Sequence, residues 1–275
     1  MSRRTRIAAA LVMAPLAIAA VLWLPSRFLA ALVAAVMMVG LWEWSALAGL
    51  TGRPARAAYL LGNALLMAAL AWATGHGMVT LMLVSLLGVV WWLLAILWLA
   101  RFDFAARDTA GARVLKLFAG SACALPAWAA LCLTHASEPR GPLWALFALM
   151  IVWVADTGAY FAGSRWGKRK LAPRISPGKS WEGLVGGLLA SLLLAWAAMP
   201  LLHLGADGLP RLLLLAGVTT VVSVAGDLFE SMMKRHAGAK DSSHLIPGHG
   251  GVLDRIDSLM AALPVFVVMK GWLGL

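Results

Sequence analysis

The chain has 275 residues, of which 62% are hydrophobic and only 13% carry a formal charge. Soluble domains are about half apolar and a quarter charged, so this composition excludes an ordinary soluble protein and indicates a membrane protein. The formal net charge of +11 suits contact with anionic lipids or anionic substrates. Nucleic acid is not expected as a partner, because the charges lie in short loops between apolar segments.

The first apolar run, residues 7–24, follows a short basic N-terminus. A secretory signal peptide has a similar layout, but this run is long enough to span a bilayer and further spans follow, so a retained first helix is expected. Spanning takes about 17–25 residues. We therefore predict an all-α polytopic membrane protein with about nine transmembrane helices, the later eight lying near residues 28–50, 57–73, 77–100, 113–134, 141–163, 184–204, 210–230 and 259–275.

Basic residues are distributed unequally among the connections between these runs. Of the 23 Lys and Arg residues, 19 lie at the N-terminus or in every second loop. The positive-inside rule then places the N-terminus in the cytoplasm and the C-terminus outside. Of the twelve acids only Glu138 and Asp207 fall in outer loops, so an active site is expected at the cytoplasmic membrane surface.

We expect one integral membrane domain over residues 1–275. Residues 1–140 are interpreted as helices for scaffolding or dimerisation, and residues 141–275 as the catalytic helices and loops. Cys123 and Cys132 are nine residues apart in one predicted helix, at different depths, so no disulfide is expected between them.

The stretch 223–258 concentrates charge in an otherwise apolar chain. Asp227, Glu230, Ser231 and Lys234 are spaced so that they share one face of a helix that begins in the membrane and ends in the cytoplasm. A carboxylate within a span is costly and normally faces a cavity, a partner or a metal.

A glycine-rich turn, residues 247–251, follows this helix. Glycines there allow a positive φ and close approach of the backbone to a ligand, so their N–H groups are candidates for holding phosphate oxygens. Asp254 and Asp257 come next, on one face of the first turn of the last helix. Carboxylates from two helix ends, with Lys and Arg between them, suit Mg²⁺ and a polyphosphate. His249, between two glycines, is expected to touch the substrate, whereas the spacing of the histidines matches no zinc site.

A second polar segment, residues 156–183, contains six basic residues in one predicted inner loop. Such a patch usually faces lipid headgroups. Within it, residues 176–180 read Ser-Pro-Gly-Lys-Ser and are expected to open the next helix, where free N–H groups with Lys179 would form an anion site.

These motifs resemble the signature of the phosphatidate cytidylyltransferases, also called CDP-diacylglycerol synthases. The resemblance lies in Ser231-Met-Met-Lys-Arg, in Lys240-Asp241, and in the run from Ile246 through Pro-Gly-His-Gly-Gly-Val-Leu to Asp254-Arg-Ile-Asp257. The segments Asp156-Thr-Gly-Ala-Tyr160 and Ser-Pro-x-Lys-Ser-x-Glu-Gly are also similar, although Lys is usual in the family where this chain has Gly178. The resemblance covers residues 150–258. Outside this range, Glu43 in the sequence Trp-Glu-Trp also resembles the family, but more weakly.

The resemblance implies a Mg²⁺-dependent nucleotidyltransferase of a bacterial inner membrane that converts CTP and phosphatidate into CDP-diacylglycerol and pyrophosphate. A second cation and a homodimer are left open. The residues implied as catalytic are Asp227, Lys234, Arg235, Asp254 and Asp257, with Asp227 and Asp254 as metal ligands and Asp257 as a further carboxylate. The residues implied in substrate binding are Asp156, Lys179, Ser180, Ser231, Lys240, Asp241, His249, Gly250, Gly251 and Arg255.

Two alternatives stay open. A CTP-dependent enzyme on another lipid, such as a polyprenol kinase or a CDP-archaeol synthase, would share the nucleotide site, although the signature disfavours it. An ion-coupled transporter would also place acids within spans, but it predicts paired broken helices in two repeated halves, and neither is found in the sequence.

Overall fold

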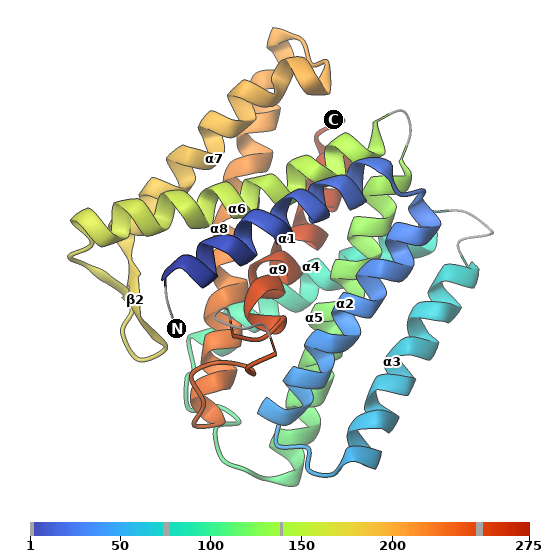
Figure 1. Cartoon of the computed structure of the whole chain (residues 1–275), viewed down its shortest axis with the longest axis vertical. Helices are drawn as coiled ribbons and strands as arrows, with labels where there is room; N and C mark the ends of the chain where they lie inside the picture. The colour runs from blue at the N-terminus through green and yellow to red at the C-terminus, as the bar shows by residue number, and fades with distance from the viewer. Residues whose placement is uncertain (1–2, 74–77, 138–139, 246–249) are drawn as a thin grey trace.

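The computed structural model describes residues 3–73, 78–137, 140–245 and 250–275, with only the backbone described for residues 3–12. Over these ranges the chain forms nine α-helices and a β-hairpin (Figure 1). The helices are α1 (Arg3–Trp23), α2 (Ser26–Leu47), α3 (Arg53–Ala73), α4 (Val79–Leu99), α5 (Ala110–Ala136), α6 (Gly141–Trp166), α7 (Trp181–Leu202), α8 (Leu209–His236) and α9 (Leu253–Trp272). The strands are β1 (Lys170–Ala172) and β2 (Ser176–Ser180), and a short 3₁₀ turn, η2 (Ala206–Gly208), precedes α8.

Each predicted apolar run coincides with one of these helices. Seven stretches, α2 to α7 and Ala206–His236, are long and apolar enough to cross a membrane. This confirms a helical, polytopic membrane protein. In α1 the stretch Met13–Trp23 is apolar but short for a membrane span. The first turns of α9 contain three charged residues, Asp254, Arg255 and Asp257. Nine spans therefore stay a prediction, as does the orientation.

The prediction that residues 176–180 open a helix is wrong, whereas the predicted helical fold holds for the described chain outside one short hairpin. These residues form β2, which pairs antiparallel to β1 with Lys170 opposite Ser180. Pro177 disfavours a helical conformation at the residue before it, and Gly178 is a poor helix former. The helix starts only at Trp181, where the Ser180 hydroxyl accepts a hydrogen bond from the N–H of Gly183 at 3.1 Å.

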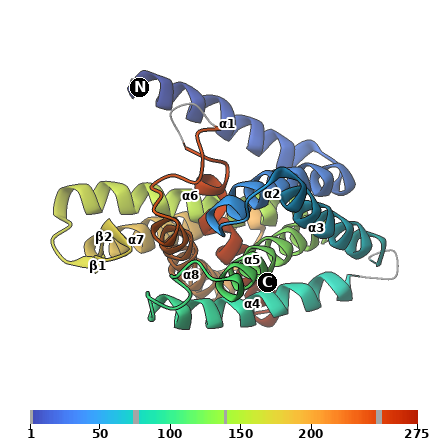
Figure 2. The same cartoon turned by 90° about the horizontal axis from the view of Figure 1, so that it is seen from below.

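The helices form two groups joined along α8 and α9. Seen from below, α5 lies between α2 and α4, while α6, α7 and the hairpin extend to the other side (Figure 2). Small residues allow close helix contacts. At the α8–α9 crossing, a Cβ on Gly226 would lie only 2.5 Å from the carbonyl oxygen of Asp257. This contact brings Asp227 beside the first turns of α9.

An aromatic core lies directly behind the polar face of α8. The buried ring of Phe229 is surrounded by Trp44, Trp91, Trp92 and Trp98, with ring centroids 5.4–6.1 Å away. The indole N–H of Trp92 donates to the carbonyl oxygen of Met260 at 3.0 Å. That carbonyl is available because Pro264, four residues later, has no N–H to offer it. The core therefore fixes α8 against α2, α4 and α9.

The basic connections gather at one end of the molecule. In Figure 1 the turn after α2, the loop after α4, the hairpin and the loop after α8 lie toward the lower left. The connections after α1 and α7 and the C-terminus lie on the opposite side, toward the top and upper right.

Candidate active site

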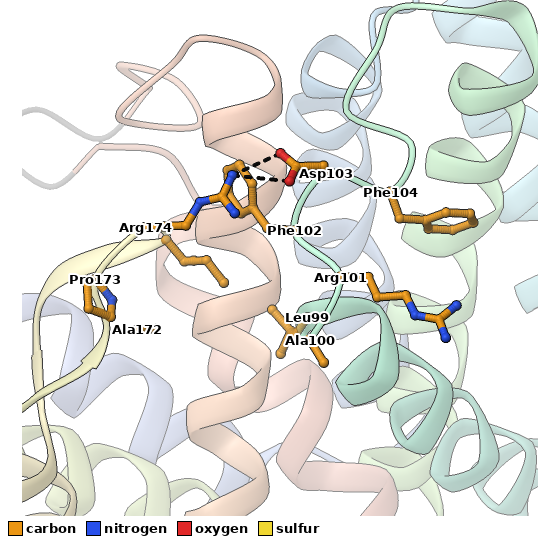
Figure 3. A pocket seen from close by; sticks show the side chains of 10 residues that line it. Leu99, Ala100, Arg101, Phe102, Asp103, Phe104, Ala172, Pro173 and Arg174 are labelled. Carbon is orange, nitrogen blue, oxygen red and sulfur yellow. Dashed lines mark hydrogen bonds and ion pairs between the residues drawn. The ribbon is translucent and has the colours of Figure 1, made fainter.

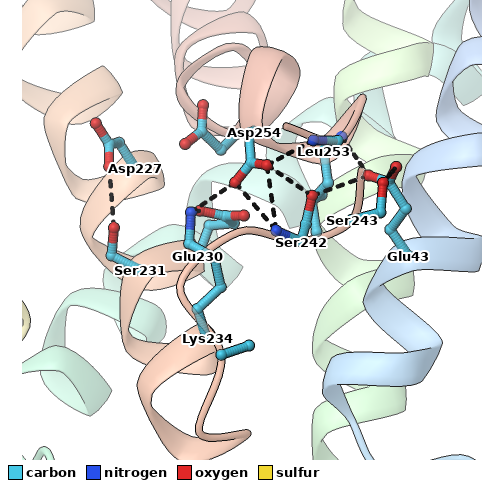
Figure 4. Close-up of polar contacts among 12 residues, drawn as sticks. Glu43, Asp227, Glu230, Ser231, Lys234, Ser242, Ser243, Leu253 and Asp254 are labelled. Atoms are coloured by element: carbon cyan, nitrogen blue, oxygen red, sulfur yellow. Dashed lines mark hydrogen bonds and ion pairs between the residues drawn. The ribbon is translucent and has the colours of Figure 1, made fainter. Parts of the chain in front are cut away.

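Several of the predicted site residues meet where α8 ends and α9 begins (Figure 4). Their side chains form two groups of charges. We call Glu230, Lys234 and Asp254 the buried cluster. We call Asp156, Lys179 and Asp227 the cavity cluster.

In the buried cluster one cation serves two acids. The Lys234 ammonium donates to Asp254 Oδ1 at 2.7 Å and forms an ion pair with Glu230, one helical turn away. The Glu230 side chain is 1% exposed, and those of Asp254 and Lys234 are 9% and 11% exposed. Charges this deeply buried are tolerated only when paired, and the single ammonium of Lys234 is the cation that compensates both acids.

The second oxygen of Asp254 is held by the loop before α9. Asp254 Oδ2 accepts hydrogen bonds from the N–H of Gly251 at 2.7 Å and of Ser242 at 3.2 Å. Gly250 has φ of +81°, as expected for this turn, and a Cβ on Gly251 would lie 2.0 Å from the Ser242 hydroxyl. The Gly251 N–H that was predicted to bind phosphate is thus engaged by Asp254.

The cavity cluster joins three elements. Asp227 on α8 accepts a hydrogen bond from the Ser231 hydroxyl at 3.2 Å, and its other oxygen lies 2.7 Å from the Lys179 ammonium on β2. Asp156 on α6 interacts with the charges of both Asp227 and Lys179, and with Arg255 of α9. Here the hairpin meets α6 and α8.

Asp257 connects the two clusters. It is 8% exposed and lies close enough to Asp227 for the two carboxyl groups to interact, with Lys179 and Lys234 as the neighbouring cations. One Asp257 oxygen accepts from the N–H of Ser258 at 2.7 Å. The α8 and α9 carboxylates are thus together, as predicted, although Asp227 is beside Asp257 and not beside Asp254.

A cavity of about 300 Å³ opens beside the cavity cluster, between α6, α7, α8 and β2. Its polar wall includes Asp156, Lys179, Ser180 and Asp227. Much of the remaining wall is small or apolar and includes Ala155, Ala159, Leu184, Gly187 and Val224. Such a surface suits a ligand with an anionic group at one end and an apolar part at the other.

A larger hollow of about 550 Å³ lies away from these carboxylates, between the loop after α4 and the turn of the hairpin (Figure 3). Arg174 binds both oxygens of Asp103 there, at 3.0 and 3.2 Å, and stacks over the Phe102 ring. The hairpin is therefore anchored to the α4–α5 loop on the side opposite Lys179.

Arg235 does not contact the carboxylates. Its guanidinium donates to the carbonyl oxygens of Ile175 and Ala239, both at 3.2 Å. Adjacent residues on a helix point about 100° apart, which explains why Lys234 and Arg235 face different partners. A phosphate-binding role for Arg235 stays a prediction.

The remaining predicted residues lie around this site. Lys240 and Asp241 are exposed on the loop after α8, and Arg255 is exposed on the first turn of α9. Ser180 is buried and caps α7. His249 lies outside the described residues.

The sequence did not single out Glu43, Glu230 or Ser242 as site residues. Glu230 was placed on the polar face, and Glu43 was noted as a weak part of the family resemblance, although it lies within the predicted span 28–50. That position was the available signal, because a buried acid needs partners. Glu43 accepts hydrogen bonds from the loop that holds Asp254.

The chemistry of the donors fits a hard divalent cation. Asp227 and Asp257 place two carboxyl groups close together, and carboxylate oxygens are the ligands that Mg²⁺ prefers. Within the described ranges, no three acidic, His or Cys side chains already stand in a ligand arrangement. Asp254 is turned toward Lys234 and the loop.

Comparisons with known proteins agree on one family. The model of the cytidylyltransferase family matches residues 4–272. The chain is 44% identical over 272 residues to a phosphatidate cytidylyltransferase of Pseudomonas aeruginosa, covering 98% of each chain. It is 36% identical over 280 residues to one of Haemophilus influenzae, covering 96% of each. A Staphylococcus aureus protein of the same name is 43% identical over 138 residues, covering 49% of this chain and 52% of that one. By this match over nearly its whole length, the chain belongs to the cytidylyltransferase family.

Proposed function

We propose that the protein transfers the cytidylyl group of CTP to phosphatidate, giving CDP-diacylglycerol and pyrophosphate for phospholipid synthesis. Its family and the names of its full-length relatives support this reaction. The structural observation that carries the proposal is the cavity cluster, which sets Lys179 and the α8 and α9 carboxylates beside a pocket with an apolar wall.

The reaction requires alignment of two anions. A phosphate oxygen of phosphatidate attacks the α-phosphorus of CTP, an O–P bond forms, and the bond from that phosphorus to the β-phosphate breaks. The nucleophile is already anionic, so no Ser–His pair is needed to remove a proton. Catalysis then depends on orientation and on neutralising the leaving pyrophosphate.

Lys179 is suited to the reacting phosphates, because it lies at the cavity with Asp227 as its partner. Lys234 is suited to holding the two acids in place, because its ammonium group is already paired with Glu230 and Asp254. Asp227, Asp254 and Asp257 are the residues that would hold Mg²⁺, which supplies positive charge to the polyphosphate when bound. A second cation, if it binds, would be held by the same three carboxylates.

The lipid substrate fits the amphipathic character of the cavity. Its phosphate would lie at the Lys179 end, and the glycerol and the first methylenes along the wall formed by α6 and α7. The acyl chains would stay in the bilayer. This arrangement explains why the site is built from membrane helices.

The topology proposed with this function has nine spans and a cytoplasmic N-terminus in a bacterial inner membrane. The grouping of the basic connections at one end supports it. Dimerisation through residues 1–140 is part of the same proposal. A reporter fused to the C-terminus that is active in the cytoplasm would contradict it.

One assay tests the reaction. Purified protein is incubated with phosphatidate in detergent micelles, labelled CTP and Mg²⁺, and the lipid products are separated. A CDP-lipid that appears with equimolar pyrophosphate is expected. No turnover, or turnover only with a polyprenol acceptor, would overturn the proposal. Ion flux in proteoliposomes without any turnover would instead favour a transporter.

A further inference from the structure

Glu43 lies in α2, far in sequence from every predicted site residue, and its side chain is turned toward the loop before α9 (Figure 4). The residue is 3% exposed. Its carboxylate accepts hydrogen bonds from the N–H of Val252 at 3.1 Å and of Leu253 at 2.7 Å. It also accepts from the hydroxyls of Ser242, at 3.0 Å, and Ser243.

These contacts make Glu43 the cap of α9. The first N–H groups of a helix have no partner within the helix, and Val252 at the N-cap position provides no side-chain cap of its own. A carboxylate at this position also interacts favourably with the helix dipole. Four hydrogen-bond donors therefore compensate a charge that would otherwise be costly to bury.

The cap and the Asp254 carboxylate are linked through Ser242. The Ser242 hydroxyl lies 3.0 Å from an oxygen of Glu43 and 3.0 Å from an oxygen of Asp254, so its single hydrogen serves one of them at a time. The Ser242 N–H donates to Asp254 as well. A Cβ on Gly251 would lie 2.4 Å from Glu43, so the missing side chain lets the carboxylate approach. A displacement of Glu43 would thus shift the groups that orient Asp254.

We infer that Glu43 is a positioning residue for the proposed cytidylyl transfer. It holds Ser242, Ser243 and the start of α9 at Val252 and Leu253, and so fixes Asp254, without touching the substrate itself. Its catalytic part rests on the proposed function. It also gives α2, in the half of the chain interpreted as scaffold, a direct contact with the catalytic loop.

The test is Glu43→Gln, with Asp207→Asn as the matched acid-to-amide control. Asp207 is an exposed acid that pairs with Arg211 far from the site. The glutamine presents one oxygen and one NH₂ group to α9, so one N–H of the helix loses its acceptor. Hydrogen exchange should accelerate in residues 250–255 and stay unchanged in the aromatic core. The kcat should fall about 10- to 100-fold, with KM for CTP little changed.

A second set of variants keeps the inference falsifiable if Glu43→Gln does not fold. Ser242→Ala and Ser243→Ala remove the contacts from the loop side, and Ser242→Ala should lower kcat the more, because Ser242 reaches both carboxylates. If Glu43→Gln folds, the double variant Glu43→Gln/Ser242→Ala should show a smaller fold-decrease in kcat than the product of the fold-decreases in the two single variants.

Three results would overturn the inference. One is unchanged exchange in residues 250–255 of Glu43→Gln, the second is a kcat within twofold of the wild type, and the third is a loss of protection throughout the chain. If Glu43→Gln does not fold, wild-type kcat in both serine variants would also overturn it. A wild-type enzyme that forms no CDP-lipid would instead overturn the proposed function and the catalytic part of the inference, while exchange would still decide whether Glu43 caps α9.

Discussion

The two charge clusters at the site use the same residue types in opposite ways. In the buried cluster Lys234 is enclosed with Glu230 and Asp254, all three at most 11% exposed. In the cavity cluster Lys179 and Asp227 are 22% and 30% exposed and border the 300 Å³ cavity. A ligand can displace the exposed pair at little cost, whereas breaking the buried one leaves an acid without compensation.

This difference separates the structural roles of two lysines that the family resemblance implies in the site, Lys234 and Lys179. Lys234 extends from α8, whose preceding turn contains Phe229 in the aromatic core. Lys179 extends from a short hairpin at the edge of the molecule. We therefore expect Lys234 to be needed for both the fold and the reaction, and Lys179 for the reaction alone.

The largest expected effect is that of Lys234→Met. Removing the cation leaves Glu230 and Asp254 facing each other in a buried site, and breaking a buried pair in this way typically costs about 3–5 kcal/mol. The yield of folded protein in detergent and its midpoint of thermal unfolding should both fall, together with activity. A variant with wild-type stability would show that the two acids do not depend on Lys234.

Asp254→Asn should remove activity, by about 100-fold or more, while the protein still inserts into the membrane. The amide keeps the volume of the side chain but loses its charge, and its NH₂ group would meet the Gly251 N–H or the Lys234 ammonium. CDP-lipid formation and the amount of folded protein should be measured on the same preparation. Near-normal turnover would mean that Asp254 has no part in the reaction.

How much of this site the sequence could predict depends on how local each contact is. The face of Asp227, Glu230, Ser231 and Lys234 follows from helical spacing alone, and their contacts lie where it places them. The partners of Glu43 are about 200 residues away in sequence. No periodicity could predict them, because they depend on how α2 packs against the start of α9.

The hairpin shows a different limit. Residues 176–180 were expected to open a helix, but only Ser180 takes part in the helix start, as the N-cap of α7. The strand itself depends on pairing with residues 170–172, which a local pattern does not contain. Helix geometry predicts that Arg235 points away from Lys234. It does not predict that Arg235 donates a hydrogen bond to the carbonyl oxygen of Ile175, because that contact depends on where the hairpin packs.

Lys179→Met provides the complement to Lys234→Met. Its partner Asp227 is partly exposed and keeps Ser231 as a hydrogen-bond donor, so stability should change by no more than about 1 kcal/mol. Activity should fall by about 100-fold, because a cation that stabilises the developing charge is lost. The comparison of the two lysines fails if Lys179→Met unfolds as readily as Lys234→Met, or if its turnover stays near that of the wild type.

Arg174→Ala should have the smallest effect, because it changes only how firmly the hairpin is held. The ion pair with Asp103 is exposed, and such pairs contribute at most about 1 kcal/mol, which corresponds to roughly a fivefold change in rate or affinity. Arg235 and the strand pairing still hold the hairpin in this variant. We expect KM for CTP or phosphatidate to rise within that limit, and the difference from the wild type to shrink at high salt, where the ion pair is screened. A loss as large as that of Lys179→Met would mean that Arg174 itself contacts the substrate, and the hollow beside Phe102 would then belong to the active site.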